Sequence, residues 1–172
     1  TGSGSALAGE RVLLTGPWKY QATADLRQTP MPQKMDQNPN IVTVLSNGMI
    51  EPLVPFGIKG AIWYQGESNV GRAEQYARLL PALIRDWRGR FQSGEFPFFI
   101  VQLANWQKTP PEPPAQDAWA ELREAQAKTA STVPHAGLAV AVDIGDAEDI
   151  HPKNKQEVGR RLGLAALHEA YG

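Results

Sequence analysis

Three apolar runs, each followed by a segment with helical periodicity, are the main pattern of hydrophobic and polar positions after residue 55. The runs occupy 60–65 (GAIWYQ), 96–104 (FPFFIVQLA) and 137–144 (GLAVAVDI). Such short apolar runs predict strands, and the nearly continuous one at 96–104 is typical of a strand buried on both faces of a parallel sheet. The first 55 residues are less regular, with short strand-like runs at 11–20 and 40–50 among turn residues.

A helix is predicted after each of these strands. The first extends from about 71 to 88, and Pro81 within it is a place where the helix can bend. Its apolar stripe, at helical spacing, consists of Tyr76, Leu80, Leu83 and Trp87. The second begins near Asp117, a good N-cap, and the third near Pro152, because proline suits the first helical turn. The alternation of strands and helices predicts an α/β fold, with helices on both faces of the sheet.

Polar residues gather directly after each predicted strand. In chain order they are Gln65, Gly66, Glu67, Ser68 and Asn69, then Gln102, Asn105 and Trp106, then Asp143, Asp146, Glu148, Asp149 and His151. In open parallel sheets, ligands bind outside the carboxyl ends of the strands. The sequence therefore predicts a site at this one edge of the sheet.

His151 is the sharpest single candidate for catalysis, because it follows a dense acidic run, DIGDAEDIHP. A histidine held in one tautomer by a neighbouring carboxylate can act as a general base. The alternative is an ordinary histidine that enters a helix from a solvated acidic loop. His135 and His168 are expected to be structural or exposed.

The segment around Ser68 allows two chemical roles. A serine nucleophile often lies on a sharp strand-to-helix turn, and GESNV has the first glycine of that motif but not the last. Alternatively, Ser68 or Asn69 caps the following helix. The amides of Gln65 and Asn69, and the close backbone approach that Gly66 permits, would suit the stabilisation of an oxyanion.

Composition excludes several other classes of function. The chain has 172 residues, a net charge of −1 and no cysteine. There is therefore no thiolate nucleophile, no zinc–thiolate site, and no electrostatic case for a nucleic-acid or anionic-membrane partner. The spacing of Asp143, Asp146 and Asp149 does not match a calcium-binding EF-hand loop, and no metal site is expected.

Four segments in order resemble the sialate O-acetylesterase family, carbohydrate acetylesterases of the SGNH hydrolase class. They are VLSNGMIEPLVPFGIKG (44–60), AIWYQGESN (61–69), FPFFIVQLANW (96–106) and DIGDAEDIHPKNKQEVGRRL (143–162). The resemblance implies a three-layer α/β/α sandwich, flavodoxin-like in outline, and hydrolysis of acetyl esters on sugars without a cofactor. It also allows a periplasmic or extracellular location, although the sequence does not fix the compartment.

The resemblance assigns roles to the three polar clusters. His151 matches the general base of the family, and Asp149 is the expected partner of its ring, with Glu148, Asp146 and Asp143 as the other candidates. Gln65, Gly66 and Glu67 correspond to the block that supplies oxyanion-hole and substrate-positioning groups. Asn105 and Trp106 lie where a sugar could pack, although Trp106 could equally be a core or rim aromatic residue.

The nucleophilic serine of the family belongs to a Gly-Gln-Ser-Asn segment after the first strand, and residues 1–60 contain no such segment. We therefore expect residues 41–172 to be the carboxyl-terminal part of an SGNH domain, and residues 1–40 an irregular lead-in or a partial accessory segment. The expected partners are an O-acetylated carbohydrate and an upstream fragment that carries the serine and the missing strand.

Two other hypotheses remain open from the sequence. The chain could be a self-sufficient esterase with Ser68, His151 and Asp149 as its catalytic triad. It could also be a non-catalytic carbohydrate-binding module derived from an esterase.

Overall fold

A sheet of three parallel strands, ordered β1-β2-β3, forms the centre of the fold. The computed structural model describes residues 43–54, 56–108, 111–112, 114 and 116–171, so the expectations for residues 1–40 lie outside the described part. The strands are β1 (Ala61–Trp63), β2 (Phe98–Val101) and β3 (Ala136–Ala139). All four residues of β2 are buried, as the continuous apolar run predicts for a central parallel strand.

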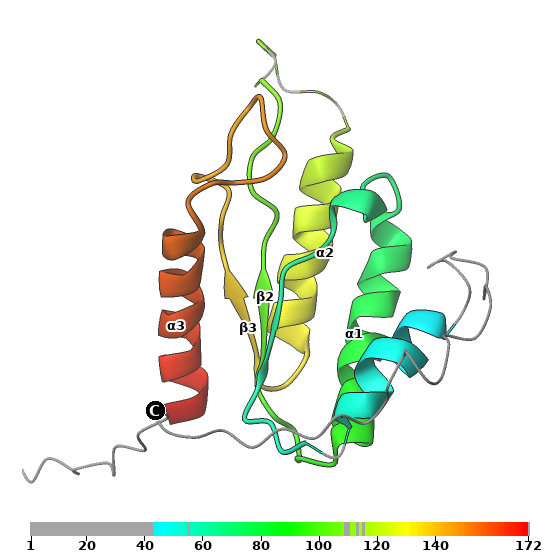
Figure 1. Cartoon of the computed structure of the whole chain (residues 1–172). Helices are drawn as coiled ribbons and strands as arrows, with labels where there is room; N and C mark the ends of the chain where they lie inside the picture. The colour runs from blue at the N-terminus through cyan, green and yellow to red at the C-terminus, as the bar shows by residue number, and fades with distance from the viewer. Residues whose placement is uncertain (1–42, 55, 109–110, 113, 115, 172) are drawn as a thin grey trace, which may run out of the picture. The chain divides into compact units, whose positions relative to one another are not determined.

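Helices cover both faces of this sheet (Figure 1). α1 (Ala73–Phe91) packs along α2 (Ala118–Thr132) on one face, and α3 (Lys155–Tyr171) packs on β2 and β3 from the other. Between the sheet and α1 and α2 lies the larger core, which includes Phe98, Ile100 and Leu122. The smaller core beneath α3 is formed by Val101, Ala104, Ala141 and Val158. The predicted α/β fold with a parallel sheet and two helical layers is thus confirmed.

The strands are shorter than the apolar runs that predicted them. The third run extends to residue 144, but β3 ends at Ala139, and Val140 and Val142 beyond it are 42% and 40% exposed. A strand requires a neighbour to pair with, and apolar composition alone does not supply one.

The strand-like run at 40–50 was wrongly interpreted, because the described part of it, residues 43–50, is turn and helix. Ser46–Ile50 forms a π-helical turn, and Glu51–Leu53 continues as a 3₁₀-helix. The Asn47 N–H donates to the Thr43 carbonyl at 2.8 Å. Local hydrogen bonds of this kind satisfy the backbone of a segment that pairs with no strand among the described residues.

The predicted N-cap is correct for α2, whereas the N-cap considered for α1 is wrong. Asp117 is the N-cap of α2, as predicted, and its carboxylate accepts from the N–H groups of Trp119 and Ala120 at 2.9 and 3.2 Å. Neither Ser68 nor Asn69 caps α1, whose N-cap residue is Arg72, and α1 continues through Pro81 without interruption.

The third helix begins at Lys155, three residues after the predicted start at Pro152. Asn154 precedes it, and its side-chain oxygen accepts from the Glu157 N–H at 3.2 Å. A side-chain acceptor can satisfy a free first-turn N–H, which a proline cannot do. Among the described helices, none is long and apolar enough to cross a membrane.

Candidate active site

Hydrogen bonds join the three polar clusters at the carboxyl edge of the sheet. The side-chain oxygen of Asn105, after β2, accepts from the Gly145 N–H, after β3, at 2.7 Å. From α2, the Gln126 amide donates to the Gln65 carbonyl, after β1, at 3.2 Å and accepts from the Leu103 N–H, after β2, at 2.9 Å. The ends of all three strands are therefore fixed relative to one another, as the sequence pattern predicts.

His151 and Asp149 lie next to each other in the loop after β3. His151 Nδ1 is 3.3 Å from Asp149 Oδ1, and the same oxygen accepts from the His151 backbone N–H at 2.9 Å. The His151 side chain is 87% exposed and that of Asp149 36%. The backbone hydrogen bond from His151 is the main cause of a lowered pKa of Asp149, with smaller contributions from the ring and from Lys153. The carboxylate is thus ionised and able to hold the imidazole with Nε2 directed away from it.

The other three acids of the loop have different partners. Asp143 forms a two-pronged ion pair with Arg161, with Arg161 Nη2 2.8 Å from Asp143 Oδ2. Asp146 accepts from the Glu148 N–H at 3.0 Å, and Glu148 lies 3.5 Å from Lys108 Nζ. Within the described residues, Asp149 is the acid of this loop that contacts the ring of His151.

Arg161 also lowers the pKa of the Asp143 carboxyl, from an ordinary 3.8 to about 2, chiefly through its hydrogen bonds. A carboxyl whose pKa is depressed by folding stabilises the folded state above its unfolded pKa. That stabilisation is lost as the pH falls from about 3.8 towards about 2.

We expect Arg161→Gln to return the pKa of Asp143 towards 3.8, as measured by carbon-detected NMR titration of the carboxyl. Arg160→Gln is the control, because Arg160 pairs with Glu157 instead, at 2.7 Å. An unchanged pKa of Asp143 in Arg161→Gln would contradict this assignment.

The loop after β1 is held in place by several contacts. The Gln65 side-chain amide donates to Asn69 Oδ1 at 2.7 Å. Gly66 is buried, and a Cβ added there would lie only 3.0 Å from Leu122 and 3.1 Å from Gln126 Nε2. A side chain at position 66 would therefore collide with this core packing, and the predicted close approach of the Gly66 backbone to an oxyanion stays a prediction. Glu67 opens a short 3₁₀-helix, Glu67–Asn69, in which Ser68 is exposed.

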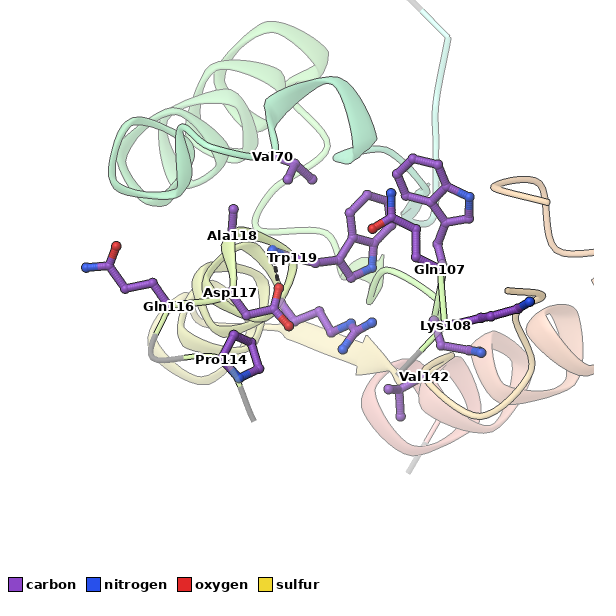
Figure 2. A pocket seen from close by; sticks show the side chains of 12 residues that line it. Val70, Gln107, Lys108, Pro114, Gln116, Asp117, Ala118, Trp119 and Val142 are labelled. Carbon is purple, nitrogen blue, oxygen red and sulfur yellow. Dashed lines mark hydrogen bonds between the residues drawn. The ribbon is translucent and has the colours of Figure 1, made fainter. Parts of the chain in front are cut away.

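A hollow of about 860 Å³ opens beside the end of β2 (Figure 2). Asn105, Trp106, Trp119 and Arg123 line part of it. The two indole rings are 5.3 Å apart between centroids and inclined by 46°. Arg123 donates from Nε to the Leu103 carbonyl at 3.0 Å and from Nη2 to the Ala104 carbonyl at 3.3 Å. The hollow thus offers an aromatic surface and polar groups, a combination that suits a sugar.

Sequence reasoning missed Gln126, Trp119, Arg123 and Arg161 as parts of this edge. For Gln126 a signal was present, since it lies four residues after Leu122 on the apolar stripe that predicted the helix. A polar residue on a buried helical stripe must find hydrogen-bond partners. In the described part of the chain, no cluster of three or more His, Asp or Glu side chains could hold a metal ion.

The parallel α/β sheet covered by helices on both faces agrees with the expected fold of an SGNH hydrolase. The chain belongs to the family described as carbohydrate esterase, sialic acid-specific acetylesterase, whose model matches residues 26–168. The resemblance found in the sequence is thereby confirmed.

Individual relatives agree with this placement. The chain is 36% identical over 160 residues to the sialate O-acetylesterase of Homo sapiens, and 37% identical over 147 residues to that of Mus musculus. These matches cover 85% and 76% of this chain, but only 31% and 27% of the relatives. A solved carbohydrate acetylesterase from Xanthomonas citri superimposes with a TM-score of 0.68 at 49% identity, over 74% of this chain and 29% of that one. The chain thus spans less than a third of the length of these relatives.

Proposed function

We propose that this chain supplies the base histidine and the oxyanion loop of a carbohydrate O-acetylesterase, a serine hydrolase that removes acetyl esters from sugars. The observation that carries the proposal is the contact of His151 with Asp149, at the sheet edge that also holds the Gln65–Gly66 loop. Family membership supports the reaction class.

In this mechanism a serine hydroxyl attacks the acetyl carbonyl. With Nδ1–H donated to Asp149, His151 takes the serine proton on Nε2. The negative charge that develops on the carbonyl oxygen is met by the Gly66 N–H and the Gln65 side chain. When the tetrahedral intermediate collapses, the ester C–O bond breaks, and the sugar oxygen takes the proton from His151 and leaves as a hydroxyl. Water, activated by the same histidine, then releases acetate from the serine. Glu67 braces the loop, and the sugar packs against Trp106 with Asn105 nearby.

The serine belongs, in this proposal, to an upstream segment of the same protein that also completes the sheet. The position of β1 at the edge of the sheet that the described residues form supports this. Ile62 is 69% exposed, although its register partner Phe99 on β2 is only 4% exposed. On the same face, the Tyr64 hydroxyl is buried without a hydrogen-bond partner among the described residues. An exposed apolar edge strand invites pairing with another strand.

Labelling with a fluorophosphonate and assay with an aryl acetate test the origin of the serine. With the upstream segment present, we expect the label on that segment, and Ser68→Ala should keep kcat within about twofold. Ser131→Ala is the matched control, because that serine is also exposed and its hydroxyl donates within α2, to the Lys128 carbonyl at 3.0 Å. A label on Ser68, with activity lost in Ser68→Ala, would instead establish the self-sufficient triad. Sugar binding without turnover in the complete protein would favour the non-catalytic module.

A further inference from the structure

Gln126 is a buried amide that forms hydrogen bonds with the backbone at the ends of β1 and β2. Its side chain is fully buried on α2. Its Oε1 accepts from the Leu103 N–H at 2.9 Å, and its Nε2 donates to the carbonyls of Gln65 and Val101 at 3.2 and 3.4 Å. Burial of an amide is unfavourable unless its groups are paired, and an apolar side chain would fill the same space. The hydrogen bonds of Gln126 therefore do more than fill space in the core, because they hold the backbone at the ends of β1 and β2.

The Gln65 carbonyl is held from two helices at once. Besides the amide of Gln126 on α2, the hydroxyl of Tyr76 on α1 donates to it at 2.9 Å. The Tyr76 hydroxyl in turn accepts from Trp63 Nε1 at 3.2 Å. This oxygen is thus drawn towards the core between α1 and α2, and the orientation of the Gln65–Gly66 peptide is fixed.

The direction of the Gly66 N–H follows from this. In a trans peptide the N–H lies opposite to the carbonyl oxygen, and the structure contains no cis peptide bond among the described residues. With the Gln65 oxygen held by Gln126 and Tyr76, the Gly66 N–H points away from both helices. In the described part of the chain, no group accepts a hydrogen bond from it. Gly66 is buried, and a buried N–H of this kind normally has an acceptor.

We propose that Gln126, together with Tyr76, is a positioning residue that directs the Gly66 N–H at the oxyanion of the reaction. This rests on the proposed esterase function. Neither side chain touches the substrate. Both act through the carbonyl of Gln65, so that the donor on the other side of the same peptide is oriented before the charge develops. Preorganised donors of this kind give most of their stabilisation in the transition state and little in the ground state.

The test uses the full-length protein with its upstream segment and an aryl acetate substrate. Loss of one oxyanion donor lowers kcat by about 10²–10³-fold, so a misdirected donor in Gln126→Leu should lower kcat by about 10–100-fold. KM should stay within about twofold, because ground-state binding does not use this donor. The inhibition constant of phenylboronic acid, which forms a tetrahedral adduct, should rise in parallel with the loss of kcat.

Gln126→Glu gives a signature that a purely structural role would not produce. A protonated carboxyl can still donate to the Gln65 carbonyl, whereas a carboxylate would repel it. We expect activity close to wild type at low pH and a fall with rising pH that the wild-type profile lacks. A Gln126→Glu pH profile identical to that of wild type would count against the proposal.

Thr129→Val is the matched control. Thr129 is 2% exposed on the same helix and loses one hydrogen bond, to the Ala125 carbonyl at 2.9 Å, but does not contact the loop. It should lower stability without changing kcat by more than about twofold.

If Gln126→Leu fails to fold, Tyr76→Phe removes the other donor to Gln65 and should still lower kcat with KM unchanged. A folded variant with full kcat, or a loss equal to that of Thr129→Val, would overturn the proposal while the esterase function stands. An inactive wild-type protein would overturn both.

Discussion

Replacement of His151 by alanine is expected to lower kcat for an aryl acetate by about 10⁴–10⁶-fold in the protein with its upstream segment. The physical reason is that the variant has no group to take the proton of the nucleophilic serine. Stability should change little, because the side chain is 87% exposed and makes few packing contacts. Steady-state kinetics, with a thermal melt to verify folding, measures both effects.

Three further variants show whether the effect belongs to this histidine and to this acid. His168→Ala removes another exposed histidine, on α3, whose ring nitrogen lies 3.9 Å from Glu169, and it should leave kcat unchanged. Asp149→Asn should approach the loss seen for His151→Ala, whereas Glu148→Gln should not, because Glu148 pairs with Lys108. Full activity of His151→Ala, or an equal loss for Glu148→Gln and Asp149→Asn, would contradict the assignment.

Much of the fold could be predicted because its strongest signals are local. Continuous apolar runs identified the positions of β1, β2 and β3, and the stripe of Tyr76 and Leu80 identified α1. The Asp117 cap was also local, since it depends on one side chain and the two N–H groups that follow. Where pairing decides the outcome, local pattern was insufficient. Residues 43–50 look like a strand and are turn and helix, because none of the strands in the described part of the chain pairs with them.

In the candidate site, too, contacts between residues close in sequence could be predicted, and contacts between distant residues could not. His151 and Asp149 are two residues apart, so their contact could be anticipated from the chain alone. Arg161 and Asp143 lie on opposite sides of that loop, and their ion pair depends on how α3 packs. Gln126 is further still, 61 positions from the Gln65 carbonyl that it holds. Such contacts require the relative placement of α2 and the sheet, which periodicity does not encode. The roles of these residues in catalysis remain predictions.

Gly145→Ala is expected to damage the site through its backbone. A Cβ at Gly145 would overlap the backbone of Asn105, so one of the two segments would have to move. The hydrogen bond from the Gly145 N–H to Asn105 Oδ1, 2.7 Å long, would be lost with that movement. We expect a loss of about 1–3 kcal/mol in the free energy of unfolding, as for other overpacked sites.

Activity should fall further than stability in this variant. The loop that contains Gly145 also holds Asp149 and His151, and a misplacement of about 1 Å at a catalytic group can cost about 10²-fold in rate. Gly89→Ala is the control, since nothing lies within 4 Å of a Cβ there and alanine favours the exposed end of α1. It should stabilise the protein by up to about 1 kcal/mol with kcat unchanged. Denaturant unfolding and kinetics on both variants provide the comparison. If Gly145→Ala matched Gly89→Ala in both measurements, the Asn105–Gly145 contact would not be what positions the histidine loop.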